Sequence, residues 1–152
     1  AAWLIGGFEK ELSQVIALAA FMPVIIGMAG NIGTQSSTII VRGLATGSVS
    51  PNAWFRVVSK QLAAGVILGV GYGVLLGALA LFQFASFATL GLVVGLSIAI
   101  TMTLAALMSS ILPLLLHRMR FDPAVSTGPL VTTGVDIVGI FIYFSIARLL
   151  LF

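Results

Sequence analysis

Asp136 is the residue whose chemistry most needs an explanation in this sequence. It is the one acidic residue inside a long apolar segment, GPLVTTGVDIVGIFIYF, and Thr132 lies one helical turn before it. A carboxylate near the centre of a bilayer costs at least ~2.5–3.5 kcal/mol, so such a residue faces a partner or a water-filled path. No lysine or arginine lies deep in an apolar segment to neutralise it. The pattern favours a substrate or ion site; a carboxylate that is protonated or bonded to a neighbouring helix is the alternative.

A second polar group interrupts the first long apolar segment, in the stretch MAGNIGTQSSTIIVRG at 28–43. Pro23 removes a backbone donor from any helix here, and non-helical backbone at membrane depth survives only where protein buries it or water lines it. If the segment stays helical, one face carries Gly27, Asn31, Gln35, Thr38 and Arg42, and the opposite face carries Ile32, Ile39 and Ile40. The polar face indicates either hydrogen bonding between helices or a pore lining with oxygen ligands.

The elements that position these residues are membrane spans. Hydrophobic residues make up 60% of the chain and charged residues 7%, against about 25% charged in soluble domains. Four segments contain the roughly 20 apolar residues that a span needs: 13–41, 61–84, 87–116 and 129–150. Residues 1–8 cover about 12 Å as a helix and are interpreted as the tail of an earlier span. We expect an all-α, polytopic transmembrane helix bundle with four full spans and the remnant of a first helix, in one domain over 1–152.

Basic residues predict the orientation of these spans. Five of the seven lysine and arginine residues lie in two loops: Arg42, Arg56 and Lys60 follow the first span, and Arg118 and Arg120 follow the third. By the positive-inside rule, both loops face the cytoplasm and both termini face outside. Trp54, in the first of these loops, is expected at the level of the lipid headgroups.

Depth brings the two polar groups together. Asn31 is eleven residues from Arg42 and Asp136 fourteen from Asp122, which is about 16 Å and at most about 21 Å along a helix. Carboxylate, amide and hydroxyl oxygens suit a hard cation such as Mg²⁺ or Ca²⁺, and not zinc or copper. One carboxylate is too little to strip Mg²⁺ of its water, so the chemistry favours a homodimer that holds a largely hydrated divalent cation.

Glycines form a stripe on the second span. Gly65, Gly69, Gly73 and Gly77 recur every four residues, and Gly91, Gly95 and Ala99 repeat the pattern on the third span. Such stripes allow close helix packing, and a glycine-lined pore wall is the alternative.

Composition excludes other classes of function. The spans contain one carboxylate and no histidine, and the chain has no cysteine, so an enzyme is not expected. His117, the lone histidine, lies in a basic loop where a contact with solvent or headgroups is the simpler role. The sequence has no basic cluster with interleaved aromatic residues, which is the pattern that indicates nucleic-acid binding.

Two motifs resemble the MgtE family of magnesium channels. PVIIGMAGNIGTQSSTIIVRGLATG at 23–47 is similar to the family's proline, glycine-asparagine and glycine-threonine-glutamine signature. LPLLLHRMRFDPAVSTGPLVTTGVDIVGIFIYFSIARLLL at 112–151 is similar to its last two membrane helices, including the aspartate of the final one.

The resemblance implies a homodimer with five helices per subunit and a Mg²⁺ pore on the dimer axis, in a cell membrane, with the bacterial inner membrane as the expected location. It implies that Asp136 faces hydrated Mg²⁺, with Asn31 and the backbone near Thr132 as neighbours; Gly27 and Gln35 complete the expected set of metal-site residues. It also implies a regulatory cytoplasmic region before the first helix that this sequence does not contain. The alternative function is a proton- or sodium-coupled secondary carrier with Asp136 as its protonation site. A membrane scaffold without transport is disfavoured by the unpaired acid.

Overall fold

The structure, a computed structural model, describes residues 2–8, 17–49, 54–84, 88–124 and 128–151. These residues form a short helix and four long ones: α1 (Ala2–Gly6), α3 (Ala17–Ala45), α4 (Trp54–Gln83), α5 (Ala88–Arg118) and α6 (Pro129–Leu151). The four long helices are long and apolar enough to cross a membrane. A helix pairs its own backbone N–H and C=O groups, and a spanning segment needs this pairing because lipid offers no hydrogen-bond partners to the backbone. The expected all-α fold with four full spans is confirmed.

The helices extend past the apolar segments that the sequence outlines. α4 begins at Trp54, seven residues before the expected start at 61, and α3 continues to Ala45. Thirty residues of helix are about 45 Å long, whereas the hydrocarbon core of a bilayer is about 30 Å thick. Hydropathy marks the part of a helix inside the hydrocarbon, and the polar ends of these helices continue into the headgroup region.

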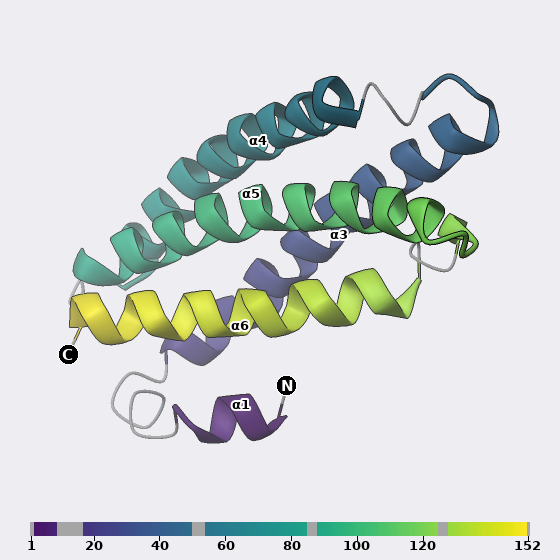
Figure 1. Cartoon of the computed structure of the whole chain (residues 1–152). Coiled ribbons are helices and arrows are strands. Elements are labelled where there is room, and N and C mark those ends of the chain that lie inside the picture. Colours follow the sequence, from purple (N-terminus) through teal and green to yellow (C-terminus); the bar gives the residue numbers. More distant parts are fainter. Residues whose placement is uncertain (1, 9–16, 50–53, 85–87, 125–127, 152) are drawn as a thin grey trace.

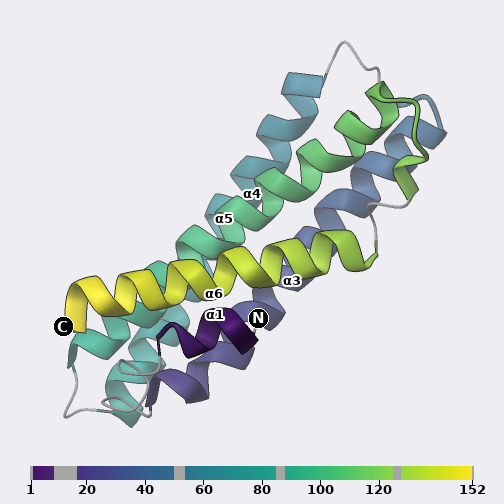
Figure 2. The same cartoon turned by 60° about the horizontal axis from the view of Figure 1, so that its bottom comes forward.

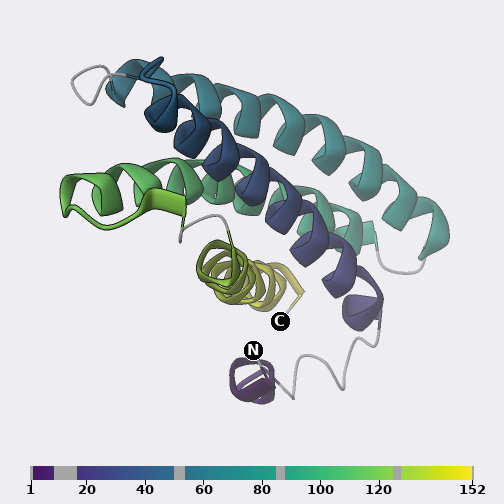
Figure 3. The same cartoon turned by 90° about the vertical axis from the view of Figure 1, so that its right-hand side faces the viewer.

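α5 is the central helix of the bundle (Figure 1). It packs against α4, α3 and α6, and α3 also packs against α6. Figure 2 shows α1 beside α6, where Phe8 and Phe144 stack with ring centroids 5.0 Å apart. Seen from the side in Figure 3, α4 and α1 lie at opposite edges of the molecule. This order leaves α3 and α6 in contact with each other, and both also pack against α5.

Glycines bring α4 and α5 into backbone contact. A Cβ atom added at Gly69 would lie 2.8 Å from the Ala99 carbonyl oxygen, and one at Gly77 would lie 2.8 Å from the Gly91 carbonyl oxygen. Gly73 meets the Gly95 carbonyl in the same way at 2.5 Å. A side chain at any of these positions would separate the helices. The stripe is therefore a packing surface, and its interpretation as a pore wall is wrong.

The bundle has two distinct ends. The turn after α3 and the loop after α5, residues 46–49 and 119–124, lie at the same end, and the end of α4 lies at the other (Figure 1). The expectation that the two basic segments share one side is confirmed, but their assignment to loops is wrong for Arg42 in α3, for Arg56 and Lys60 in α4, and for His117 and Arg118 in α5. That this side faces the cytoplasm stays a prediction.

Candidate functional site

The polar segment of α3 remains helical through Pro23 and its glycines. All five members of the expected polar face are exposed on the isolated chain: Gly27, Asn31, Gln35, Thr38 and Arg42. Of the residues expected on the opposite face, Ile32 and Ile40 are buried. Ile39 is 50% exposed, so its assignment to the opposite face is wrong. It lies one turn after Gln35 and borders the polar face for that reason.

Hydrogen bonds from this segment go mostly to its own helix or to α4. Thr38 Oγ1 donates to the Thr34 carbonyl at 2.8 Å, and Ser36 Oγ donates to Gln61 Oε1 at 3.3 Å. Among the described residues, no hydrogen bond holds the side chains of Asn31 or Gln35 to another helix. The exposed amides are therefore available to a ligand, to water or to a second protein chain.

Asp136 lies half-buried on α6, with Thr132 half-buried one turn before it. No described residue donates a hydrogen bond to the Asp136 carboxylate or forms an ion pair with it. Thr132 Oγ1 makes a long hydrogen bond of 3.4 Å to the Pro129 carbonyl. Within the described part of the chain, the carboxylate thus lacks the counter-charge that a structural role in lipid would need.

Gly33 fixes the register between α3 and α6. A Cβ atom at Gly33 would lie 3.3 Å from Val135 Cγ2 and 3.4 Å from Val131 Cγ1. Asp136 directly follows Val135, and Asn31 lies two residues before Gly33 on the antiparallel helix. The two residues are therefore level with each other along the bundle, as the count of residues from the basic loops predicts.

The same register places the remaining members of the expected set. Gln35 is level with Thr132, one turn closer to the basic loops than Asn31 and Asp136. Gly27 lies one turn further from these loops than Asn31, about 6 Å along the helix. The five residues follow one another along two adjacent helices, and no hydrogen bond joins one of them to another within the described part of the chain.

The chemistry of this set is that of neutral oxygens around one carboxylate. Among the described residues, no group of three or more histidine, cysteine, aspartate or glutamate residues is placed to hold a metal ion. A dehydrated Mg²⁺ requires near-ideal octahedral geometry, and the ion usually keeps several waters. The arrangement suits hydrogen bonds to a hydrated cation better than direct coordination.

Sequence reasoning missed a row of buried hydroxyls on α5. Ser97, Thr101 and Ser109 are almost fully buried, and their hydroxyl oxygens have no hydrogen-bond partner among the described residues. A Cβ atom at Gly33 would lie 2.9 Å from Ser109 Oγ, and one at Gly139 would lie 3.0 Å from Thr101 Cγ2. The sequence signal for this row is the spacing of the three hydroxyl residues in multiples of four within an apolar span.

Comparisons with known proteins agree with the sequence motifs. A family model named MgtE, described as "Divalent cation transporter", matches residues 22–146. The "Magnesium transporter MgtE" of Thermus thermophilus is 40% identical over 148 residues, covering 97% of this chain and 32% of the relative. The protein of the same name from Bacillus subtilis is 37% identical over 144 residues (95% and 32%), and that of Enterococcus faecalis 34% over 146 residues (96% and 32%). The chain spans about a third of the length of these curated relatives.

Proposed function

Because this chain belongs to the MgtE family of divalent cation transporters, we propose that it moves Mg²⁺ across the membrane. It is a multi-pass membrane protein with four helices that are able to span a bilayer. The three relatives are each named a magnesium transporter, which supports Mg²⁺ as the cation. We further propose that residues 1–152 act as one transmembrane pore domain.

One observation supports this function most strongly. Asp136 is half-buried in a spanning helix, has no partner among the described residues, and is level with the exposed amide of Asn31. A bare carboxylate at this depth is costly in lipid. A cation that passes along α3 and α6 supplies the missing charge, and water in its path solvates the carboxylate between passages.

A second copy of the chain completes the site. Asn31, Gln35 and Asp136 expose polar groups on one chain, and lipid-facing polar groups are rare in membrane proteins. A two-fold axis beside α3 and α6 covers these groups with the same groups of the partner. A pore then lies on this axis and contains the Asp136 carboxylates of both copies. Its negative charge is twice the charge that one chain offers.

The cation keeps its water in this pore. Mg²⁺ binds its ligands at about 2.0–2.1 Å and gives up water reluctantly. Asp136 from both copies accepts hydrogen bonds from coordinated water, and its oxygens stay about 4 Å or more from the ion, beyond direct bonding distance. The side chains of Asn31, Gln35 and Thr132 and the backbone at Gly27 line the path with further oxygens.

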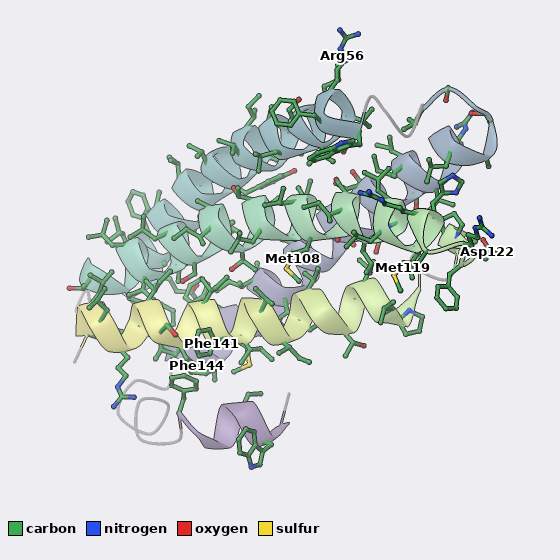
Figure 4. All side chains as sticks on the ribbon, in the orientation of Figure 1. Arg56, Met108, Met119, Asp122, Phe141 and Phe144 are labelled. Atoms are coloured by element: carbon green, nitrogen blue, oxygen red, sulfur yellow. The ribbon has the colours of Figure 1, made fainter. Side chains whose placement is uncertain are left out.

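Flux measurements with a matched charge control test this function. Asp136→Asn keeps the shape of the side chain and removes its charge, so Mg²⁺ flux into liposomes should fall about tenfold or more, the scale of losing one hydrogen bond to a charged group. Asp122→Asn removes the same charge from the loop after α5 (Figure 4), where Asp122 Oδ1 accepts a 2.9 Å hydrogen bond from the Ala124 backbone, and should leave flux unchanged. Wild-type flux in Asp136→Asn would remove Asp136 from the ion path.

Imposed gradients separate the channel from a coupled carrier. Mg²⁺ flux is expected to follow the membrane potential and the Mg²⁺ gradient alone. The measurement compares liposomes with and without a proton gradient, and with and without a sodium gradient. Flux that requires either gradient would favour the secondary carrier, with Asp136 as the coupling site.

A further inference from the structure

Two grooves flank the last turns of α5 at the basic end of the bundle. The first has a volume of about 850 Å³, lies between Trp54 at the start of α4 and the end of α5, and includes His117, Arg118 and Arg120. The second has a volume of about 240 Å³ and lies between α5 and α6. Ile111 and Leu115 line both grooves. The two grooves therefore adjoin along α5.

The first groove is basic. The side chains of His117, Arg118 and Arg120 are exposed. Within the described residues, no carboxylate forms an ion pair with any of them. Trp54 also lines this groove, and tryptophan is a side chain typical of the headgroup level of a membrane. This groove has the composition of a site for an anionic group at the membrane surface.

Arg120 occupies a backbone position that glycine usually fills. Its φ is 63°, in the left-handed region. Arg120 N donates to the His117 carbonyl at 3.1 Å, and Phe121 N donates to the Leu116 carbonyl at 2.9 Å. This pattern closes a helix and favours glycine at the left-handed residue. An arginine here places a guanidinium group on the wall of the first groove at a conformational cost that function can explain.

The second groove is apolar and extends to the depth of one leaflet. Its wall includes Met108, Leu112 and Val131, and Figure 4 shows Met108 between α5 and α6. Met108 and Arg118 are ten residues apart, which is about 15 Å of helix. Half of a hydrocarbon core of about 30 Å is the same length. A chain that starts at the basic groove therefore reaches the bilayer centre at Met108.

We propose that a glycerophospholipid with an anionic headgroup occupies the two grooves. Its phosphate pairs with Arg118 and Arg120, its glycerol region lies at Trp54, and one acyl chain passes Ile111 and Leu115 into the groove between α5 and α6. The cytoplasmic leaflet carries anionic lipid, and the positive-inside rule assigns this end of the bundle to that leaflet. The residues of this site differ from those of the proposed ion path, and the inference does not depend on that path.

Fluorescence of Trp54 tests this site. The chain has two tryptophans, so Trp3→Phe leaves Trp54 as the sole emitter. This variant is placed in phosphatidylcholine vesicles with a minor fraction of phosphatidylglycerol that carries bromine on its acyl chains, a short-range quencher. The quenched fraction of Trp54 emission is expected to exceed the fraction of brominated lipid in the vesicles. The reason is that each arginine raises the local preference for the anionic lipid about fivefold. Brominated phosphatidylcholine at the same fraction should quench only in proportion to its share.

Three variants test which arginines cause the preference for the anionic lipid. Arg118→Gln and Arg120→Gly should each lower it about fivefold; glycine suits the φ of residue 120, so the helix end is kept. Arg56→Gln is the control, because Arg56 is two residues from Trp54 and points away from the bundle in Figure 4. It should keep the preference.

Three results would overturn the proposal. Equal quenching by the two brominated lipids would show that the headgroup is not recognised. A loss in Arg56→Gln as large as that in Arg118→Gln would show general surface charge. Absence of quenching by either lipid would show that protein, such as a second copy of the chain, covers the grooves.

Discussion

Tyr143 on α6 donates a hydrogen bond of 2.9 Å from its hydroxyl to the carbonyl oxygen of Leu18, near the start of α3. The two residues are 125 positions apart in the sequence, and both are almost fully buried. α6 carries Asp136 and α3 carries Asn31. This bond therefore ties together the two helices on which the proposed ion site depends.

Tyr143→Phe should weaken the bundle without changing its packing. Hydrogen bonds between membrane helices contribute about 0.6 kcal/mol on average and up to about 1.7 kcal/mol, so the free energy of unfolding should fall by that amount. Tyr72→Phe is the control, because Tyr72 is 42% exposed on α4. Reversible unfolding in mixed micelles measures both variants. Equal stability of the two would mean that the bond to Leu18 contributes nothing.

Leucine substitutions on α4 test the glycine contact with α5. Gly69→Leu and Gly73→Leu place side chains against the backbone at Ala99 and Gly95, and overpacking typically costs about 1–3 kcal/mol or more. Gly71→Leu is a matched control on the same helix, because a Cβ atom there meets no atom within 4 Å. The yield of folded protein in detergent should fall for the first two and stay near wild type for the third. Similar yields for all three would contradict close packing.

Gly33 and Ser109 should show coupled effects on stability. Ser109 is 1% exposed with an unpartnered hydroxyl, so Ser109→Ala should be neutral or stabilising. Gly33→Ala brings a methyl group to 2.9 Å from Ser109 Oγ and should cost about 1–3 kcal/mol. The double variant should recover part of this loss, because the nearest atom is gone. Strict additivity in unfolding measurements would show that the two residues do not touch.

Labelling tests the orientation of the bundle. The chain has no cysteine, so a single new cysteine is a clean probe. Ser48→Cys lies in the turn after α3 and Gln83→Cys at the last residue of α4, at opposite ends of the bundle. In intact cells an impermeant maleimide should label Gln83→Cys and should reach Ser48→Cys only after the membrane is opened. The reverse pattern would place the basic loops outside.

Periodicity made much of this arrangement predictable. The recurrence of Gly69, Gly73 and Gly77 identified a packing face, and the assignment of Asn31 and Gln35 to one face of α3 was correct. The start of α4 was missed because Trp54 and the residues after it continue the helix beyond the hydrocarbon, where hydropathy carries no signal.

Tertiary contacts set the limit of the sequence reasoning. All four spans are strongly apolar, so composition did not identify α5 as the central helix. The burial of Ser97, Thr101 and Ser109 follows from that central place and was not foreseen. The misassignment of Ile39 has a different cause, since its position one helical turn after Gln35 already places it on the border of the polar face.

The central claim is that Asp136 recognises Mg²⁺ through its water shell. Hexaamminecobalt(III) has inert ligands and resembles hydrated Mg²⁺ in size, so it tests this claim without any loss of ligands. We expect it to inhibit Mg²⁺ flux into liposomes, with an inhibitory concentration that rises in proportion to Mg²⁺, and to inhibit Asp122→Asn to the same extent. Undiminished Mg²⁺ flux at saturating hexaamminecobalt(III) would contradict the account, since it would mean that the ion sheds its water before it reaches Asp136.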